Sequence, residues 1–486
     1  MTPHKTVAII GGGLSGGAVA CYLAQQRAPG AILVFEPRAE IGPGLAYGTD
    51  DPSHRINVPA AKMSLLPAQE SHFVDWIART NAVSDDAEAL AADGQLYVRR
   101  SLFGRYVYEH IQPFLQSRRI EHVQDSVASV EKADGGQWSI ETFDGRRYEA
   151  DIVVLATTHP PPAVPDNLHR ALASDPRMIS DATVMGALSA IEPSARVVIV
   201  GTGLTMVDVV ASLDRQGHRG QIHAFSRRGL LPRGHAQQAY EPFGEFVRSP
   251  PYSTRELLRK VRSTIKDAAK QDIPWQPVID AVRSQALLFW PQMPVSERAK
   301  IVKHLRAYWD VHRFRVAPQL ENVIRRRQKS GTLTVRAASL VEAVAGPDAI
   351  AITVRSRRTR EQETISADYI VVTTGPAHGS VVSMQPHLAT LARQGLIAAD
   401  PFGLGISCNV RGQALAANGD AVPGILIAGP LARGTFGELM GVPQVTNYAL
   451  SIASEVLEEL KSPEFERGSL AGALATSDNN ASAVRR

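Results

Sequence analysis

Three glycines near the start of the chain have the spacing of a phosphate-binding turn. Gly11, Gly13 and Gly16 follow a strand-like apolar segment, and Leu14 and Ser15 between them open a helix-like one. The first glycine permits a tight strand-to-helix turn, the second lets a pyrophosphate approach bare backbone, and the third allows close helix–strand packing. The unpaired amides and the positive end of the helix dipole then attract phosphate oxygens. This pattern predicts a dinucleotide-binding loop.

An acidic residue ends the next strand-like segment. Glu36 lies 25 positions after Gly11 and can accept hydrogen bonds from the two hydroxyl groups of a ribose. Pro37 and Arg38 follow it and are expected to line the same end of the nucleotide. We assign this first loop to FAD. The alternative, a glycine-rich turn without a ligand, is disfavoured because strand, helix and acid all stand in order.

The same order of elements recurs in the middle of the chain. Gly201 and Gly203 follow an apolar strand and lead through Leu204 and Thr205 into a helix, and Ser226 lies 25 positions after Gly201. Ser226 therefore occupies the position that an acid occupies in the first unit. The repeat predicts a second dinucleotide site.

The second unit departs from the first in two ways. Met206 stands where the third glycine would be, and Arg227 and Arg228 follow Ser226. An acid beside the ribose would repel a 2′-phosphate, whereas arginines pair with phosphate through two hydrogen bonds. We therefore expect NADPH in preference to NADH. The alternative is a vestigial domain whose arginines are merely solvated.

Each unit ends in a further apolar strand, which favours an α/β chain with two Rossmann-type dinucleotide-binding domains. We expect these domains to be of the glutathione-reductase-like three-layer ββα type and to carry a helical insertion. Segment 253–256 has the form of a helix-capping box within this insertion. The expected parts are the first part of the FAD domain at 1–165, the NAD(P) domain at 166–375 with the insertion at about 250–331, the return to the FAD domain at 376–464, and a disordered tail at 465–486.

Composition excludes several classes of site. The 486 residues include only two cysteines, Cys21 and Cys408, so the chain has neither a Cys-x-x-Cys dithiol nor a cysteine zinc site, and we expect no metal. The formal net charge is +4, and the arginine runs at 325–327 and 355–360 could suggest nucleic acid. Solvated helix ends and hairpin turns explain these runs better, so no nucleic-acid partner is expected.

The hydrophobic pattern predicts no membrane span, because no stretch of about 18 apolar residues occurs. A strand-like segment begins at Val7 and leaves no room for a signal peptide in this sequence. We therefore expect a cytoplasmic protein. The sequence predicts no oligomeric state.

Several stretches outside the two loops have a distinctive order of residues. They are 42–49, 54–60, 226–232, 309–313 and 429–430, the last followed by Glu438 and 442–443. Together they resemble a bacterial family of two-dinucleotide FAD/NAD(P)-binding proteins related to class B flavin monooxygenases. That group includes an FAD-dependent urate hydroxylase and amino-acid N-hydroxylases. The resemblance covers nearly the whole chain except the tail.

The resemblance also implies where FAD contacts come from. The implied residues are Ala46, Asn57, Val58, Met63, Val127, Gly429, Pro430 and Glu438. Many such flavoproteins end the last strand of the FAD domain in Gly-Asp, and here Pro430 replaces the aspartate, so backbone groups or Glu438 must substitute. The Phe-x-Gly-x-x-x-His signature of Baeyer–Villiger and N-oxide-forming enzymes is absent, which disfavours those reactions.

Four residues are candidates for catalysis or substrate binding. Asn57 could donate a hydrogen bond to the flavin or the substrate, or be an ordinary turn asparagine. His54 could act as a general base. His312 and Arg313 could hold an anionic or nitrogen-rich substrate, or could end a helix packed on the sheet.

We therefore expect an FAD-dependent, NADPH-using oxidoreductase. The leading hypothesis is a monooxygenase that uses O2 to hydroxylate a small, polar, nitrogen-containing molecule, either a urate-like purine or an amino-acid amine. One alternative is a flavin reductase or dehydrogenase that passes electrons to a quinone or a protein. The other is a non-catalytic sensor with a structural FAD.

Overall fold

The computed structural model describes residues 5–133 and 135–461, so the tail predicted at 465–486 lies outside the described residues. Its first sheet has six strands in the order β15-β16-β7-β1-β2-β3, all parallel except β15. These strands are β1 (Thr6–Ile10), β2 (Ala31–Phe35), β3 (Glu121–Val123), β7 (Ile152–Leu155), β15 (Gln413–Leu415) and β16 (Ala421–Ile427). Strand β16 thus returns late in the chain to pair with β7.

An antiparallel excursion connects β3 to β7. It is a three-stranded sheet of β4 (Val127–Lys132), β5 (Trp138–Thr142) and β6 (Arg147–Ala150). Antiparallel pairing of neighbouring strands needs only short turns, whereas β1 and β2 are parallel and require a helix between them.

The second sheet has seven strands in the order β13-β12-β11-β10-β9-β14-β8. They are β8 (Met178–Ile179), β9 (Val197–Val200), β10 (Ile222–Ser226), β11 (Leu333–Ala345), β12 (Ile350–Ser356), β13 (Gln362–Ala367) and β14 (Tyr369–Val372). The long strand β11 pairs in parallel with β10 and antiparallel with β12. The second unit therefore repeats the plan of the first, a parallel sheet with an antiparallel excursion.

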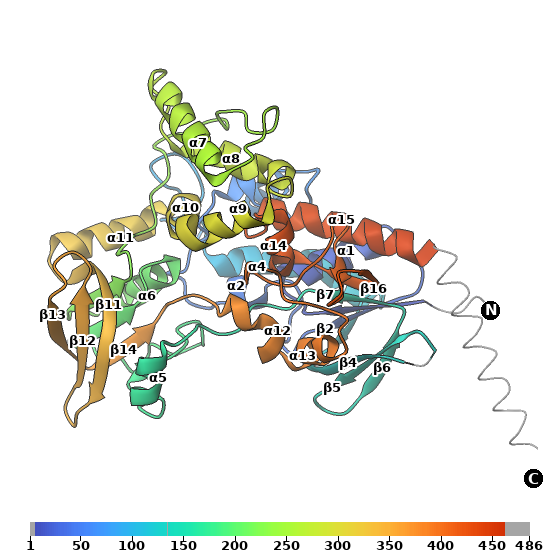
Figure 1. Ribbon diagram of the computed structural model, residues 1–486, viewed down its shortest axis with the longest axis horizontal. Coiled ribbons are helices and arrows are strands. Elements are labelled where there is room, and N and C mark those ends of the chain that lie inside the picture. The colour runs from blue at the N-terminus through green and yellow to red at the C-terminus, as the bar shows by residue number, and fades with distance from the viewer. Residues whose placement is uncertain (1–4, 134, 462–486) are drawn as a thin grey trace, which may run out of the picture.

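One helix of each unit begins directly after a glycine-rich loop. In the first unit α1 (Leu14–Gln25) packs beside the last helix, α15 (Val442–Lys461). In the second unit α6 (Leu204–Arg215) packs against α11 (Pro318–Lys329). Figure 1 shows the two sheets toward opposite ends of the molecule, with α15 lying along α1.

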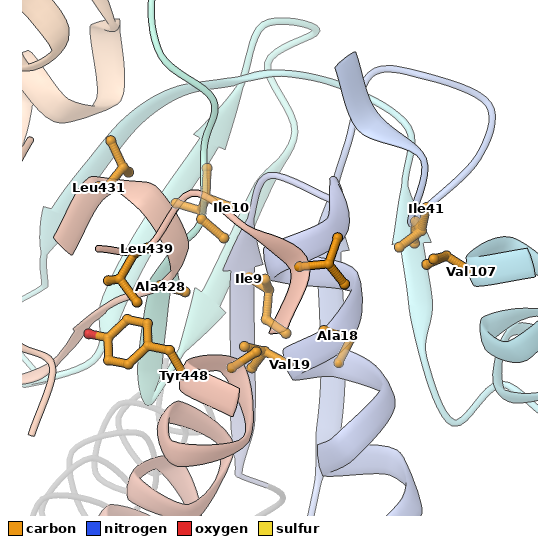
Figure 2. Close-up of a cluster of buried hydrophobic side chains, with 14 of the residues drawn as sticks. Ile9, Ile10, Ala18, Val19, Ile41, Val107, Ala428, Leu431, Leu439 and Tyr448 are labelled. Atoms are coloured by element: carbon orange, nitrogen blue, oxygen red, sulfur yellow. The ribbon is translucent and has the colours of Figure 1, made fainter. Parts of the chain in front are cut away.

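The core under the first loop is closed by residues from both ends of the chain. Figure 2 shows Ile9 of β1, Ala18 and Val19 of α1, and Tyr448 of α15 converging. The hydroxyl of Tyr448 donates to the carbonyl oxygen of Ile427 at 2.8 Å, which satisfies its only polar group inside this core. The FAD unit is therefore held together by a segment far away in sequence.

Most of the helical insertion stands apart from both sheets. Its helices are α7 (Thr254–Ala269), α8 (Gln276–Phe289), α9 (Val295–Lys300), a π-helical turn (Ile301–Leu305) and α10 (Arg306–Arg313). The predicted cap of α7 is confirmed, since Ser253 accepts a hydrogen bond from the amide of Glu256 at 3.2 Å. Figure 1 shows α7 and α8 rising away from the sheets, while α9 and α10 lie across the middle of the molecule.

The remaining helices are short or peripheral. They are α2 (Gly44–Tyr47), a 3-10 turn (Ala60–Lys62), α3 (His72–Thr80), α4 (Arg100–Gln116), α5 (Asp166–Leu172), a 3-10 turn (His378–Ser380), α12 (Val381–Met384), α13 (Pro386–Arg393), a 3-10 turn (Gly429–Ala432) and α14 (Arg433–Phe436). Within 5–133 and 135–461, no helix combines the length and the apolar character that crossing a membrane requires. The predicted fold class, two Rossmann-type units with a helical insertion, is confirmed.

Candidate cofactor and substrate site

The first glycine-rich loop has a backbone that only glycine can follow. Gly11 has a φ of +101°, and a Cβ built on it would lie 2.7 Å from the carbonyl oxygen of Ala156. A Cβ on Gly16 would lie 1.9 Å from the carbonyl oxygen of Gly11. A Cβ on Gly13 would meet only the Cα of Gly44, at 3.6 Å. The space in front of Gly13 is thus left for a ligand.

The N-terminus of α1 is ready for an anion. No side chain caps the helix, so none competes for its first amides. Glu36 is buried beside the loop, and its Oε2 accepts the amide of Gly12 at 2.9 Å. Its Oε1 accepts the amide of Arg38 at 3.1 Å, and Pro37 between them is exposed. This arrangement fits the pyrophosphate and ribose of FAD.

The segment after β16 meets α1 at the same point. Gly429 has a φ of +65°, and a Cβ on it would lie 2.2 Å from Oγ of Ser15. Gly429 begins a 3-10 turn that continues through Pro430 to Ala432. Proline offers no carboxylate, so the contacts predicted for Gly429 and Pro430 with FAD would use backbone groups.

Four other predicted FAD contacts differ in exposure. Ala46 is exposed on α2, Val58 is half-buried, and Met63 and Val127 are buried. Their contacts with FAD stay predictions.

The second loop keeps the strained glycine of the first. Gly201 has a φ of +126°, and a Cβ on it would lie 2.4 Å from the carbonyl oxygen of Thr373. A Cβ on Gly203 would meet nothing within 4 Å, which leaves room for a pyrophosphate. No side chain caps α6, which begins at Leu204 and continues through Thr205. Met206, which stands in place of the third glycine, is fully buried, so its side chain packs inside the domain.

The ribose end of the second loop carries hydroxyl groups and arginines. Oγ1 of Thr202 lies 2.7 Å from Oγ of Ser226, which also accepts the amide of Gly229 at 3.0 Å. Arg227 is exposed, while Arg228 donates to the carbonyl oxygen of His304 at 3.3 Å. This end therefore has no carboxylate to repel a 2′-phosphate.

A group of polar side chains, of which Arg433 is buried and the others are half-buried, lies where the two domains and the insertion meet. We call it the crossover cluster, and its members are His159, Asp310, His378 and Arg433. His159 follows β7, His378 follows β14, and their rings lie 4.2 Å apart. An Nη2 of Arg433 on α14 lies 3.7 Å from Oδ1 of Asp310 on α10. These two pairs come from four segments distant in sequence, and the charge of Arg433 lowers the pKa of both histidines.

Most polar atoms of the crossover cluster lack partners within the described chain. Both ring nitrogens of His159, Nδ1 of His378, Oδ1 of Asp310 and Nε of Arg433 are buried without a hydrogen bond. Buried polar atoms in folded proteins are nearly always paired. A polar ligand between the domains would supply the missing partners.

The cluster holds neutral imidazoles beside a guanidinium. Burial, together with the charges of Arg433 and Arg306, lowers the pKa of His159 to about 4. Burial lowers the pKa of His378 to about 2, with His159 and both arginines adding to the effect. Burial also raises the pKa of Asp310, although the same two arginines oppose this shift. At neutral pH each imidazole therefore offers one donor and one acceptor.

Two sequence-predicted residues form an ion pair with each other. Arg313 and Glu438 are both almost fully buried, and Nε of Arg313 donates to Oε1 of Glu438 at 2.9 Å. Burial raises the pKa of Glu438, but the charge and hydrogen bond of Arg313 outweigh this and hold it below its usual value. The guanidinium of Arg313 is engaged with Glu438, and the substrate role predicted for it stays a prediction. Only Oε2 of Glu438, which is buried without a partner, is left for a cofactor.

His54 lies in a contact between the domains. Its Nδ1 lies 3.0 Å from Oγ1 of Thr49, and its Nε2 lies 3.1 Å from Oγ of Ser212 on α6. Both ring nitrogens of His54 thus have partners within the chain, and the role of general base predicted for it stays a prediction. His312 hydrogen-bonds through Nδ1 to the carbonyl oxygen of Tyr308 at 2.7 Å, on the insertion, and its substrate role stays a prediction.

Asn57 meets a residue that sequence reasoning overlooked. Its carbonyl oxygen lies 3.1 Å from Nε2 of His235, whose ring packs on Tyr97 at 5.1 Å. Burial lowers the pKa of His235 to about 4. The predicted hydrogen bond from the Asn57 side chain to flavin or substrate stays a prediction.

The crossover cluster was also missed by sequence reasoning. The sequence did contain one signal for the two histidines. His159 lies a few residues after β7 and His378 a few residues after β14, each close to a proline. Asp310 and Arg433 carry no such signal.

Comparisons with known proteins agree with this geometry. Residues 8–160 match the FAD-NAD(P)-binding family NAD_binding_9. No curated protein matches the chain in sequence. The prediction of FAD and a nicotinamide coenzyme as cofactors is confirmed by the family match, which covers the first loop and Glu36.

Solved structures show the same fold. The chain is similar to the ornithine N-hydroxylase of Kutzneria sp. 744, solved with reduced FAD, NADP+ and L-ornithine, at 17% identity and a TM-score of 0.64, covering 94% of this chain and 100% of that one. It is similar to the ornithine hydroxylase of Pseudomonas aeruginosa at 16% identity and a TM-score of 0.62, with the same coverage. The cadaverine monooxygenase of Erwinia amylovora, bound to FAD, has 13% identity and a TM-score of 0.59, covering 95% of each chain.

These likenesses define the class by its fold. The chain has the two-dinucleotide-binding fold of flavin-dependent oxidoreductases. More narrowly, the three structures compared above have that fold in two ornithine hydroxylases and a cadaverine monooxygenase.

Proposed function

We propose that the protein is an FAD-dependent, NADPH-using monooxygenase that hydroxylates a small polar amine. The observation that carries this proposal is the crossover cluster, whose buried and unpartnered polar atoms lie where both domains and the insertion meet. The names of the compared structures, which act on ornithine and cadaverine, support an amine as substrate rather than a urate-like purine.

The cysteines favour oxygen chemistry over disulfide chemistry. Burial raises the pKa of Cys21 to about 12 and that of Cys408 to about 11, so neither thiol ionises at neutral pH. A thiolate is the reactive form in disulfide exchange. With no ionised thiol, reduction of a disulfide substrate is disfavoured.

When bound, FAD would accept a hydride from NADPH and activate O2. The chain's own part is to bind, orient and enclose. Glu36 would hold the ribose of FAD, and Gly13 and Gly203 would leave space for the two pyrophosphates. The insertion helix α10 would help to exclude water from the reacting centre, because it supplies Asp310 to the cluster.

The cluster would bind both the anionic group and the amine of the substrate. The guanidinium of Arg433 would pair with an anionic group such as a carboxylate. The neutral imidazoles of His159 and His378 would accept hydrogen bonds from the substrate amine, which must be unprotonated to react. Asp310 would keep Arg433 in place, since the two side chains already face each other.

The first test is rapid mixing of the FAD-loaded protein with NADPH without oxygen, followed by oxygen and a series of amino acids and diamines. We expect flavin bleaching, then amine-dependent hydroxylated product measured by mass spectrometry. Bleaching followed only by peroxide or by electron transfer to quinones would replace this proposal with a reductase. No bleaching with NADPH or NADH would leave a protein that only binds FAD.

The cluster is tested separately with His159→Gln. We expect KM for the amine to rise about tenfold, as for loss of one buried hydrogen bond, while the rate of flavin reduction stays unchanged. His169→Gln is the matched control, because His169 is exposed on α5. An equal change in both variants would contradict the role of the cluster.

A further inference from the structure

The arginine run 355–360 lies beside the second dinucleotide loop. It forms the turn between β12 and β13, where the amide of Arg357 donates to the carbonyl oxygen of Ala337 at 2.9 Å. Nη1 of Arg357 then donates to the carbonyl oxygen of Arg227 at 3.0 Å. The β12–β13 hairpin thus places the guanidinium of Arg357 beside the end of β10.

The register of the sheet explains this proximity. Ser226 of β10 pairs with Ala337 of β11, and Arg357 continues β12 past its pairing with β11. The loop after Ser226 folds directly onto β11, since a Cβ on Gly229 would lie 2.6 Å from the amide nitrogen of Ala337. The ribose end of the second site and the turn carrying Arg357 are therefore built side by side.

The neighbouring Arg228 points into a different environment. Its guanidinium lies 5.1 Å from the centre of the Tyr308 ring and donates to the carbonyl oxygen of His304, both in the insertion. Arg336, next to Ala337, is paired with Glu363. Arg227 and Arg357 are exposed and form no ion pair with any described carboxylate. Both side chains are therefore available to an external anion, and Arg357 is the one whose guanidinium contacts the end of β10.

We infer that Arg227 and Arg357 together bind the 2′-phosphate of the nicotinamide coenzyme, and that Arg228 is a positioning residue that joins the coenzyme loop to the insertion. This inference deepens the proposed function, because it rests on NADPH binding at the second loop. A phosphate dianion is matched by two guanidinium groups, each of which donates in a planar fork. Arg357 would thus determine specificity for the 2′-phosphate, although it lies outside the Ser226–Arg228 motif.

The test measures nucleotide binding and does not depend on turnover. The FAD-loaded protein is titrated by calorimetry with 2′,5′-ADP, which carries the 2′-phosphate, and with 5′-AMP, which lacks it. We expect Arg357→Ala to weaken 2′,5′-ADP about tenfold, as for loss of one charge-assisted contact, and to leave 5′-AMP unchanged. Arg357→Lys should recover only part of the loss, because an ammonium keeps the charge but not the fork.

Arg358→Ala is the matched control, since Arg358 is exposed in the same turn. Arg228→Ala should weaken 2′,5′-ADP less than Arg357→Ala does. Three results would overturn the inference. The first is equal binding of 2′,5′-ADP by Arg357→Ala and Arg358→Ala, and the second is loss of the preference for 2′,5′-ADP over 5′-AMP in Arg228→Ala alone. The third is equal binding of the two nucleotides by the unaltered protein. If the protein hydroxylates no amine but still prefers 2′,5′-ADP over 5′-AMP through Arg357, the proposed monooxygenase is rejected. The inferred 2′-phosphate site is then retained.

Discussion

The hydroxyl of Thr202 lies 2.7 Å from the hydroxyl of Ser226, at the position where the amide of Gly12 donates to the carboxylate of Glu36 in the first unit. Both contacts join the loop after the first strand of a unit to the end of its second strand. In the first unit the contact involves a carboxylate, which also pairs with the guanidinium of Arg38 at 3.0 Å, and in the second it involves two hydroxyl groups. The two sites therefore share a backbone plan and differ in the chemical group at the end of the second strand.

Ser226→Glu should exchange the coenzyme preference of the second site. The new carboxylate would repel a 2′-phosphate and accept hydrogen bonds from a ribose, so KM for NADPH should rise about tenfold or more while that for NADH falls. Steady-state flavin reduction with each coenzyme measures this. Ser189→Glu adds the same charge on an exposed loop and should change neither value.

Gly13→Ala and Gly203→Ala should separate the two nucleotide sites. A Cβ fits at both positions in the folded chain, but each would occupy the space expected for a pyrophosphate. Gly13→Ala should lose FAD, measured as flavin absorbance per protein, and keep 2′,5′-ADP binding. Gly203→Ala should do the opposite, and loss of both nucleotides in either variant would argue against independent sites.

Glu438→Gln should destabilise the protein, because it leaves the guanidinium of Arg313 buried and uncompensated. Breaking a buried pair in this way costs about 3 kcal/mol or more, which lowers the midpoint of thermal unfolding by several degrees. Asp267→Asn removes the partner of Lys270 in an exposed pair and should have almost no effect. If Glu438→Gln loses FAD without changing the midpoint of the FAD-free protein, Glu438 serves the cofactor instead.

Acid should weaken the contact between His235 and Asn57. Burial holds the pKa of His235 at about 4 in the folded protein, below the ordinary value of 6.5. A depressed histidine pKa contributes stability that is complete above about pH 6.5 and is lost as the pH falls toward 4, at most about 3 kcal/mol for this group. Thermal midpoints between pH 7 and pH 4 should therefore fall less steeply in His235→Gln than in His169→Gln.

The sequence alone was sufficient for the two loops because their constraints are local. The strand, the glycines and Glu36 are close in the chain, so spacing reports their geometry directly, and the φ of Gly11 shows why glycine is needed there. The position of Ser226 follows from the same spacing. Met206, which stands where the third glycine would be, is buried as part of the domain core.

The candidate substrate site could not be predicted in the same way. His159, Asp310, His378 and Arg433 come from two crossovers, the insertion and the segment after β16, and only the packing of all four brings them together. Arg313 looked like a free cation because its partner Glu438 lies 125 positions away. Arg357 looked like a solvated turn because sheet register, not spacing, places it beside Arg227.

The return of the chain to its first sheet sets an order for biosynthesis. The strands of the second sheet form one continuous stretch of sequence, so that unit can fold on the ribosome as soon as it has emerged. The first unit cannot close until β16, Gly429 and α15 have been translated, because these cover the first turn of α1. The nascent chain consequently has no complete first unit until α15 has been made, so we expect flavin to bind only after that point.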